Sequence, residues 1–491
     1  DINLPKPDKY DTAELVAFLQ QLVTYSGFYD HNLDFVSLQN IQIVASMCPS
    51  TTVGRYALTT RFTANVRIAC IAYPEKEALN SIYSSLLQLV FAHKCAGSAQ
   101  WDGPAPAKKL AACMVDAFVQ VRAGLNVDEQ RHYLFTPRDL TQWTRGLLRY
   151  ELHQASHPLL EMWAFEGGRQ LRDRLVSVKH THKFDSIIAS AMKSHFDYVS
   201  DSSGKVVFSS LMGSATDRLE LDWGEWREGW INERVIATPS RALTLRGAPV
   251  GDLAKVVGQA LVQYEREMKE LSLVLFPEAL DHVVQMERVL SQPGGHLLLV
   301  GSSGVGRRSL LSLVCYMHGL EICTPQMTRD YSLKSFKSEL KQMLPRAGVG
   351  GVPCVLLLED HQLREEALVE CVNSLLSAGE LPGLFDPQEG LPLELTRLFQ
   401  PVSTLELEPL LAPLKEEMSE AGYKHRTLYD LFVSRVGRYL HVVLSMDPSN
   451  PSFQTRCESN PALYTRCSML WMTGEPPNKS KTTVSPKIIQ Y

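Results

Sequence analysis

The chain has 491 residues with a formal net charge of −5, and 45% of its residues are apolar while 21% are charged. This length suits about three domains of ordinary size, and the near balance of 49 basic and 54 acidic residues argues against a dedicated nucleic-acid binder. No apolar run approaches the roughly 18 residues of a membrane-spanning helix, and no signal peptide precedes Asp1, so a cytosolic protein is expected.

The beginning of the chain alternates between helical and strand-like patterns. Apolar residues at helical spacing predict a helix over 12–26. The compact apolar run Ile41–Met47, which ends at Cys48, predicts a buried strand. The chain starts without a methionine, inside what looks like a strand end, which suggests a piece of a longer protein.

From about Glu75 to Leu175 the pattern becomes helical. The third of these helices has a clear start signal, in which Thr136 is the N-cap, Pro137 takes the first helical position and Asp139 completes a capping box. The expected helices are Lys76–His93, Lys109–Ala123, Pro137–Tyr150 and Pro158–Leu175.

The histidines and cysteines form no recognisable metal or disulfide pattern. The 10 cysteines are scattered without a C-x-x-C pair, which favours buried reduced thiols. His153 and His157, like His180 and His182, have spacings that suit a metal. Gln154 replaces the glutamate of a zincin motif and a third ligand is missing, so solvated histidines are preferred and no metal site is predicted.

Residues 199–250 are rich in serine, glycine and tryptophan and are predicted to form an irregular linker or insertion. Trp223, Trp226 and Trp230 lie close together in this stretch. A binding platform is one interpretation, but a packed cluster is preferred because tryptophan buries so much apolar area. Helices are expected again over Leu253–Leu271 and Glu278–Leu290.

A glycine-rich loop follows the apolar run Leu297–Val300. It reads Gly301-Ser302-Ser303-Gly304-Val305-Gly306-Arg307-Arg308-Ser309, which has the glycine spacing of the phosphate-binding motif G-x-x-x-x-G-K-[ST]. The glycines let backbone N–H groups turn toward a phosphate, and the helix expected over 307–319 points its N-terminus at the same anion. A strand-to-helix turn without a ligand is the alternative.

Arginine occupies both positions of this motif that normally carry reactive side chains. Arg307, at the lysine position, can still bind phosphate through its planar guanidinium. Arg308 replaces the hydroxyl that ligates magnesium, and a guanidinium cannot bind a cation. The sequence therefore predicts a nucleotide site that holds Mg²⁺ poorly and hydrolyses slowly.

Two later apolar runs end in acidic residues. Cys354–Leu358 leads into Glu359 and Asp360, 58 positions (359 − 301) after the loop begins, and His441–Met446 leads into Asp447. This order is that of a P-loop nucleotidase. The sequence Glu-Asp instead of Asp-Glu displaces each carboxylate by about 1 Å, which can lower a rate on the order of a hundredfold. A solvated pair of acids at a strand end is the alternative.

Taken together, these residues resemble a dynein heavy chain, over the latter part of the third AAA+ module of its motor ring and most of the fourth. The segments Ile2–Pro5 and Gly27–Tyr29 are similar to the stretch that follows the Walker B acids of a dynein module. The resemblance implies an α/β fold of P-loop AAA+ modules, with parallel sheets flanked by helices and an intervening helical lid subdomain. It assigns 1–80 to the C-terminal part of the third large subdomain, 81–270 to the lid and linker, and 271–491 to the fourth large subdomain.

For the third module, the resemblance implies that Asp1 stands at the catalytic glutamate and Cys48 at the sensor asparagine. Arg61 falls at an arginine-finger position, and Arg138 at the sensor position of the lid. A guanidinium at either place would stabilise phosphate charge across an interface. Considered alone, Arg61 is an ordinary surface arginine.

For the fourth module, the resemblance implies that the acids Glu359 and Asp360 are the Walker B pair and that Asp447 replaces the sensor asparagine. Arg466 corresponds to the finger directed at the nucleotide of the preceding module. The loop that lines the adenine pocket corresponds to Val274, Leu275 and Phe276.

The two arginines of the loop, the reversed acids and Cys457–Asn460 resemble the cytoplasmic dynein 2 branch in particular. This implies a minus-end-directed microtubule motor of ciliary retrograde transport, located in cytoplasm and cilium, whose fourth site holds ATP or ADP in a regulatory or structural role. The implied partners are neighbouring AAA+ modules and, through other parts of the intact chain, dynein intermediate, light intermediate and light chains and microtubules. Residues 386–401 and the tail after 474 depart from the family pattern.

Two other functions stay open. The module can be a nucleotide-free spacer within the ring, or the chain can be a self-contained P-loop ATPase. A sustained heptad segment is missing from the sequence, so the microtubule-binding stalk is not expected in it.

Overall fold

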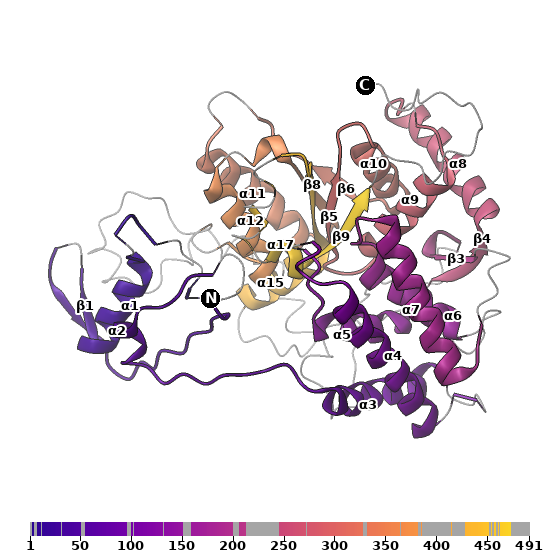
Figure 1. Cartoon of the computed structure of the whole chain (residues 1–491). Helices are drawn as coiled ribbons and strands as arrows, with labels where there is room; N and C mark the ends of the chain where they lie inside the picture. Colours follow the sequence, from indigo (N-terminus) through magenta and orange to yellow (C-terminus); the bar gives the residue numbers. More distant parts are fainter. Residues whose placement is uncertain are drawn as a thin grey trace. The chain divides into compact units, whose positions relative to one another are not determined.

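The computed structural model of the chain is shown in Figure 1. The described residues are 2–3, 7–10, 12–30, 32–50, 55–95, 100–101, 103–130, 132–150, 159–199, 206–212, 245–271, 273–327, 331–363, 365–381, 384, 414, 428–450, 453, 456–457, 460 and 462–472. The predictions that lie outside them concern Asp1, His153, His157, Trp223, Trp226, Trp230, residues 386–401 and the tail after 474. Two compact units make up the chain, residues 1–73 with 454–461, and residues 74–453 with 462–491. In the described part, none of the helices is long and apolar enough to cross a membrane.

The first unit contains a helix followed by a short hairpin. Helix α1 (Glu14–Tyr25) confirms the helix predicted over 12–26, and it leads into the antiparallel strands β1 (Gly27–Tyr29) and β2 (Phe35–Ser37). Phe18 of α1 packs edge-on against Phe28, with ring centroids 5.5 Å apart. Helix α2 (Thr60–Thr63) comes later in the same unit.

The buried strand predicted over Ile41–Met47 is wrong. These residues form no regular element, and Val44 is 90% exposed. An apolar run becomes a strand only where a neighbouring strand supplies hydrogen bonds. Within the described part of this unit, β1 and β2 pair only with each other.

The second unit begins with a helical subdomain that has its own core. Trp143 stacks on Trp163 inside it, with ring centroids 4.7 Å apart. The predicted capping box is confirmed, because the backbone N–H of Thr136 donates to Asp139 Oδ2 at 2.7 Å. The helices are α3 (Lys76–Lys94), α4 (Pro104–Gly124), α5 (Pro137–Gly146) with the 3-10 turn η1 (Leu147–Arg149), α6 (Leu159–Gly167) with the π-helical turn η2 (Gly168–Arg172), and α7 (Val178–Phe196). Helix α7 lies wholly after the predicted helical region and was not predicted.

Part of the stretch predicted to be irregular forms a pair of antiparallel strands. Strand β3 (Val206–Ser209) pairs antiparallel with β4 (Arg246–Pro249), and helix α8 (Val250–Glu267) follows directly. Helix α8 packs into the same core as α9 (Pro277–Leu290). It therefore shares a core with the P-loop sheet, and the predicted domain boundary near 270 stays a prediction. Apolar spacing predicts a helix but does not say which neighbour its apolar face meets.

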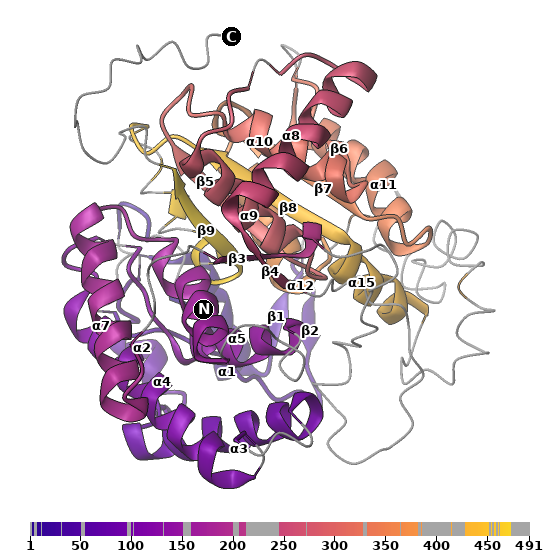
Figure 2. The same cartoon turned by 90° about the vertical axis from the view of Figure 1, so that its right-hand side faces the viewer.

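A sheet of five parallel strands forms the rest of the unit, in the order β6-β7-β8-β5-β9 (Figure 2). The strands are β5 (His296–Gly301), β6 (Glu321–Cys323), β7 (Cys354–Glu359), β8 (Leu440–Met446) and β9 (Cys467–Met472). The helical elements among them are α10 (Arg307–His318), α11 (Leu333–Gly348), η5 (Asp360–Gln362), α12 (Glu366–Ala378), α15 (Leu428–Tyr439) and α17 (Ala462–Thr465). The predicted α/β fold, a parallel sheet flanked by helices, is confirmed.

Helices cover both faces of this sheet. Helices α8, α9 and α10 share a core with Leu297 and Leu299 of β5, while α11, α12 and α15 lie on the other side (Figure 1). Burial on both faces explains why the strands are continuous apolar runs in the sequence. Because the strands are parallel, the carboxyl ends of β5, β7 and β8 meet at one edge, which is where sheets of this kind bind ligands.

Candidate functional site

The glycine-rich loop connects the end of β5 at Gly301 to the start of α10 at Arg307. Gly304 and Gly306 have φ angles of 89° and 81°, a left-handed region that favours glycine. A Cβ on Gly301 would stand 2.7 Å from the backbone oxygen of Met472, so the loop also needs glycine where it passes β9. Ser302, Ser303 and Gly304 are exposed while Val305 and Ser309 are half-buried, which leaves the loop and the N-terminus of α10 open to an anion.

The acidic residues lie at the same edge of the sheet as the loop. Val300 of β5 pairs with Met446 of β8, and Glu359 of β7 pairs with Ser445, so the residues after each strand are neighbours. Asp447 follows β8 and accepts a hydrogen bond from the backbone N–H of Ser449 at 2.9 Å. The structure therefore brings the acids of two strands to the P-loop.

Asp360 is held by a residue that the sequence did not single out. Asn450 Nδ2 donates to Asp360 Oδ2 at 2.7 Å. An asparagine in the turn after β8 carries no sequence signature of this role, since asparagine is common in turns. The backbone of the neighbouring Glu359 is fixed separately, because its N–H donates to Gln362 Oε1 at 2.8 Å.

Arg307 turns toward the sheet edge. Its side chain is half-buried and donates a hydrogen bond to the backbone carbonyl of Met446. Burial lowers the pKa of Arg307, although Asp447, Glu359 and Asp360 act in the opposite direction. An arginine stays charged under these conditions, so a positive charge is fixed at the end of β8 beside the loop.

Arg308 faces the acid that ends β7. Its Nη1 lies 3.4 Å from Glu359 Oε1, and the side chains of the two residues are 65% and 22% exposed. On the other side of the carboxylate, His361 Nδ1 lies 3.4 Å from Glu359 Oε2. Glu359 is therefore flanked by a guanidinium and an imidazole.

The side chains at the end of β7 and the start of α10 do not fit a magnesium ion. Mg²⁺ takes near-octahedral oxygen ligands at about 2.0–2.1 Å. The motif's hydroxyl position is occupied by Arg308, which also contacts Glu359, and the second acid, Asp360, accepts from Asn450. Across the described residues, no group of three or more histidine, cysteine or acidic side chains suits a metal.

The segment expected to line an adenine pocket precedes α9. Val274 and Phe276 are 57% and 37% exposed, while Leu275 is half-buried and packs against the core of the P-loop sheet. An apolar surface of this kind suits a base, and its role in binding stays a prediction.

A second candidate site is a cavity of about 200 Å³ between helix α5 and the amino-terminal ends of β5 and β9. Its lining includes both Arg138 and Arg466, which are 328 positions (466 − 138) apart in the sequence. The resemblance to dynein implied a phosphate-binding role for both. Arg138 Nη1 donates to the backbone carbonyl of Thr465 at 3.2 Å. Four more arginines line this arginine cavity: Arg145, Arg169, Arg174 and Arg288.

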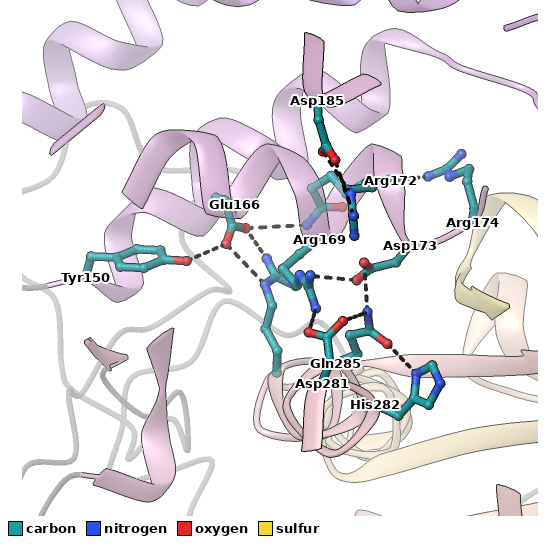
Figure 3. A network of polar contacts seen from close by, with 12 residues as sticks. Tyr150, Glu166, Arg169, Arg172, Asp173, Arg174, Asp185, Asp281, His282 and Gln285 are labelled. Atoms are coloured by element: carbon teal, nitrogen blue, oxygen red, sulfur yellow. Dashed lines mark hydrogen bonds and ion pairs between the residues drawn. The ribbon is translucent and has the colours of Figure 1, made fainter. Parts of the chain in front are cut away.

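A buried ionic network fixes the helical subdomain to α9 beside the arginine cavity (Figure 3). Glu166 of α6 is fully buried and pairs with Arg288 of α9. Arg169 Nε lies 3.4 Å from Asp173 Oδ2, and Arg169 Nη1 lies 3.1 Å from Asp281 Oδ1. Burial raises the pKa of Asp173 to about 7, even though Arg169 acts in the opposite direction.

The first unit contains the remaining predicted residues. Arg61 lies on α2 and is exposed, and its backbone carbonyl accepts a hydrogen bond from Asn65 at 3.1 Å. Cys48 is half-buried, and its carbonyl accepts from Asn3 Nδ2 at 2.7 Å. The finger role of Arg61 stays a prediction.

Family models match three parts of the chain. The model "P-loop containing dynein motor region D4" matches residues 271–490, "Dynein heavy chain, ATPase lid domain" matches 85–181, and "P-loop containing dynein motor region" matches 1–74. The chain belongs to the dynein heavy-chain family. The P-loop sheet thus falls in the D4 region of dynein, and most of the helical subdomain falls in the lid.

Individual dyneins agree with this assignment. The chain is 43% identical over 484 residues to cytoplasmic dynein 2 heavy chain 1 of Homo sapiens, and 43% identical over 474 residues to that of Chlamydomonas reinhardtii. It is 29% identical over 500 residues to the cytoplasmic dynein heavy chain of Paramecium tetraurelia. These matches cover 96%, 96% and 100% of the chain but only 10% of each relative, so the chain spans about a tenth of their length. The predicted resemblance to the dynein 2 branch is confirmed.

Proposed function

We propose that this part of a dynein motor ring holds ATP or ADP at the P-loop in a regulatory or structural role, with little hydrolysis. The observation that carries the proposal is the position of Arg307, which is half-buried at the edge of the sheet beside an exposed glycine loop. Backbone N–H groups and a guanidinium together form a binding site for phosphate.

Slow hydrolysis follows from the partners of the two acids. A general base must be within hydrogen-bond reach of the water that it activates. Glu359 faces Arg308 at 3.4 Å, and Asp360 accepts from Asn450 at 2.7 Å. These contacts occupy carboxylate oxygens that a hydrolytic site uses to orient the attacking water.

The arginine cavity supports a related role for the lid. We propose that Arg138 and Arg466 contribute to an anion site that serves the nucleotide of the preceding module. A surface with several arginines suits the phosphates of a nucleotide. In such a ring, the second compact unit would contact two different nucleotides, one at the fourth P-loop and one at the arginine cavity.

In the intact heavy chain, the proposed activity is that of a minus-end-directed microtubule ATPase for ciliary retrograde transport. Its partners would be the neighbouring AAA+ modules, the dynein intermediate, light intermediate and light chains, and microtubules, in the cytoplasm and the cilium. The similarity to the cytoplasmic dynein 2 heavy chains of Homo sapiens and Chlamydomonas reinhardtii supports this proposal. Nucleotide occupancy would act by biasing how adjacent modules pack.

The main test is a binding titration of the chain with a fluorescent ATP or ADP analogue, compared with the variant Arg307→Ala. Loss of the guanidinium should weaken binding by about tenfold or more, since a charge-assisted contact contributes about 1.5–3 kcal/mol. Turnover, measured as phosphate release, should be negligible in both proteins.

Arg172→Ala is a matched control, because this partly exposed arginine belongs to the lid, where its Nε lies 2.9 Å from Asp185 Oδ1. Its affinity should equal that of the unchanged chain. Saturable binding that Arg307→Ala leaves intact would contradict the proposed site. Absence of binding would favour the spacer function, and turnover abolished by Asp360→Asn would favour a self-contained ATPase.

A further inference from the structure

We infer that Arg308 takes the place of the divalent cation at this P-loop, so that the site binds nucleoside di- or triphosphates free of metal. The inference deepens the proposed nucleotide site and rests on it. It starts from a contact between two side chains, Arg308 of α10 and Glu359 at the end of β7, whose Nη1 and Oε1 atoms lie 3.4 Å apart.

The position of Arg308 makes this contact informative. Arg308 is the second residue of α10 and stands where the motif has the hydroxyl that ligates Mg²⁺. Glu359 ends the strand whose acids normally hold the metal. A positive side chain therefore lies between the loop and the acid strand, which is the region that a divalent cation occupies in an ordinary P-loop site.

The other acids at this edge are also committed to nitrogen donors. Asp360 accepts from Asn450 Nδ2 at 2.7 Å, and Asp447 accepts from the backbone N–H of Ser449 at 2.9 Å. A metal would have to share these carboxylates with their nitrogen donors and approach the positive charge of Arg308. The guanidinium groups of Arg307 and Arg308 thus offset most of the charge of the three carboxylates without an ion.

Arg308 can nevertheless serve a ligand, because its side chain is 65% exposed. A guanidinium presents several N–H donors in a planar fork, so one side can face Glu359 while another faces phosphate oxygens. Arg307 and the N-terminus of α10 add positive potential on the same side of the sheet. These groups together can neutralise much of the charge of a phosphate chain that carries no metal.

This arrangement also limits the chemistry of the site. A phosphate chain without a metal lacks the ion that normally neutralises the charge developing during phosphoryl transfer. The nucleotide would therefore stay bound unchanged, and its retention would be insensitive to changes in magnesium concentration. That behaviour suits a site whose occupancy serves structure or regulation.

The test is a titration of the chain with a fluorescent ADP analogue in EDTA and again in millimolar Mg²⁺. The signal that Arg307→Ala removes is assigned to the P-loop, which separates it from binding elsewhere. The dissociation constants, calculated for the metal-free analogue present in each buffer, should agree within about twofold, whereas a site that needs the metal would differ by about tenfold or more.

The variant Arg308→Thr restores the motif's hydroxyl and should reverse this behaviour. Its affinity in EDTA should fall by about tenfold, and it should recover with Mg²⁺. Electron paramagnetic resonance of Mn²⁺ gives a second readout, since the variant with ADP should immobilise Mn²⁺ at the protein and the unchanged chain should not. Arg172→Thr is the control for an arginine–carboxylate pair in the lid, and circular dichroism checks that each variant folds.

The outcomes separate the two proposals. Binding that requires Mg²⁺ in the unchanged chain would overturn the metal-free site while leaving the proposed nucleotide site intact. Immobilised Mn²⁺ in the unchanged chain would overturn it in the same way. Absence of Arg307-dependent binding in both buffers would overturn the proposed nucleotide site and this inference with it.

Discussion

The P-loop and the arginine cavity both gather arginines, but they hold them differently. At the P-loop, Arg308 is 65% exposed and lies 3.4 Å from a partly exposed glutamate. Beside the cavity, Arg288 is 3% exposed and pairs with Glu166, which is fully buried. The first arginine belongs to a surface site, whereas the second belongs to the interior of the fold.

The difference shows what each site can change without losing the fold. The P-loop depends mainly on backbone conformation at Gly304 and Gly306, so its side chains can be replaced while the cradle persists. Three arginines of the cavity, Arg169, Arg174 and Arg288, are held by acids of the lid and of α9, and replacing one of them leaves a carboxylate without its partner. Substitutions should therefore affect ligand binding at the P-loop and stability at the cavity.

The largest effect is expected for Arg288→Ala. Glu166 would remain buried and lose its charged partner, which should lower the free energy of unfolding by about 3–5 kcal/mol. Chemical unfolding followed by circular dichroism measures this change. In the folded variant, nucleotide affinity at the P-loop should stay within about twofold of the unchanged chain, because the P-loop's own contacts are intact.

Arg172→Ala is the matched control for this prediction. Arg172 lies at the end of η2 in the lid, and its Nε lies 2.9 Å from Asp185 Oδ1, but the two side chains are 33% and 48% exposed. An exposed pair contributes about 0.2–1 kcal/mol, so the control should lose much less stability. Equal losses in the two variants would contradict the distinction between interior and surface arginines.

A smaller effect is expected at Asp173. Its contribution to the free energy of unfolding should fall as the pH rises, whereas an acid whose pKa is lowered by folding stabilises the protein more at high pH. Burial raises its pKa from 3.8 to about 7, so between these values the folded chain binds a proton that the unfolded chain releases. The stability that this group contributes is full below about pH 3.8 and is lost as the pH rises through about 7. Between pH 5 and pH 8 the loss should be about 2–3 kcal/mol.

Asp173→Asn removes this titration and isolates it. Urea unfolding of both proteins at pH 5 and pH 8 should give a larger pH-dependent loss in the unchanged chain than in the variant. Asp185→Asn, in the exposed pair of the lid, should keep the pH dependence of the unchanged chain. Parallel pH profiles for Asp173→Asn and the unchanged chain would show that Asp173 is an ordinary ionised acid.

The parts of the molecule predicted from sequence are those with local signatures. Strand β5, the glycine loop and helix α10 follow from apolar runs, glycine spacing and helical periodicity, which are encoded within a few residues. The capping box at Thr136 is local in the same sense. These signals also found the acids of β7 and β8, whose neighbourhood follows from parallel pairing.

The parts that were missed depend on contacts between distant residues. The pair of Glu166 and Arg288 joins helices 122 positions apart, and in the sequence both look like surface residues of amphipathic helices. The strand prediction for the exposed run Ile41–Met47 was wrong because an apolar pattern does not show whether a partner strand pairs with it. Partner identity across the fold is the information that periodicity lacks.

The smallest effect is expected for Asn450→Ala at the P-loop. The variant loses the 2.7 Å hydrogen bond to Asp360, which is partly exposed, so the free energy of unfolding should fall by only about 0.5–1.5 kcal/mol. With one nitrogen donor fewer at Asp360, binding of the ADP analogue should begin to depend on Mg²⁺ by a few fold. Ser449→Ala is the control, because the contact of Ser449 with Asp447 is made by its backbone. A loss of stability as large as that of Arg288→Ala would place Asn450 among the interior polar residues and would remove the contrast between the two sites.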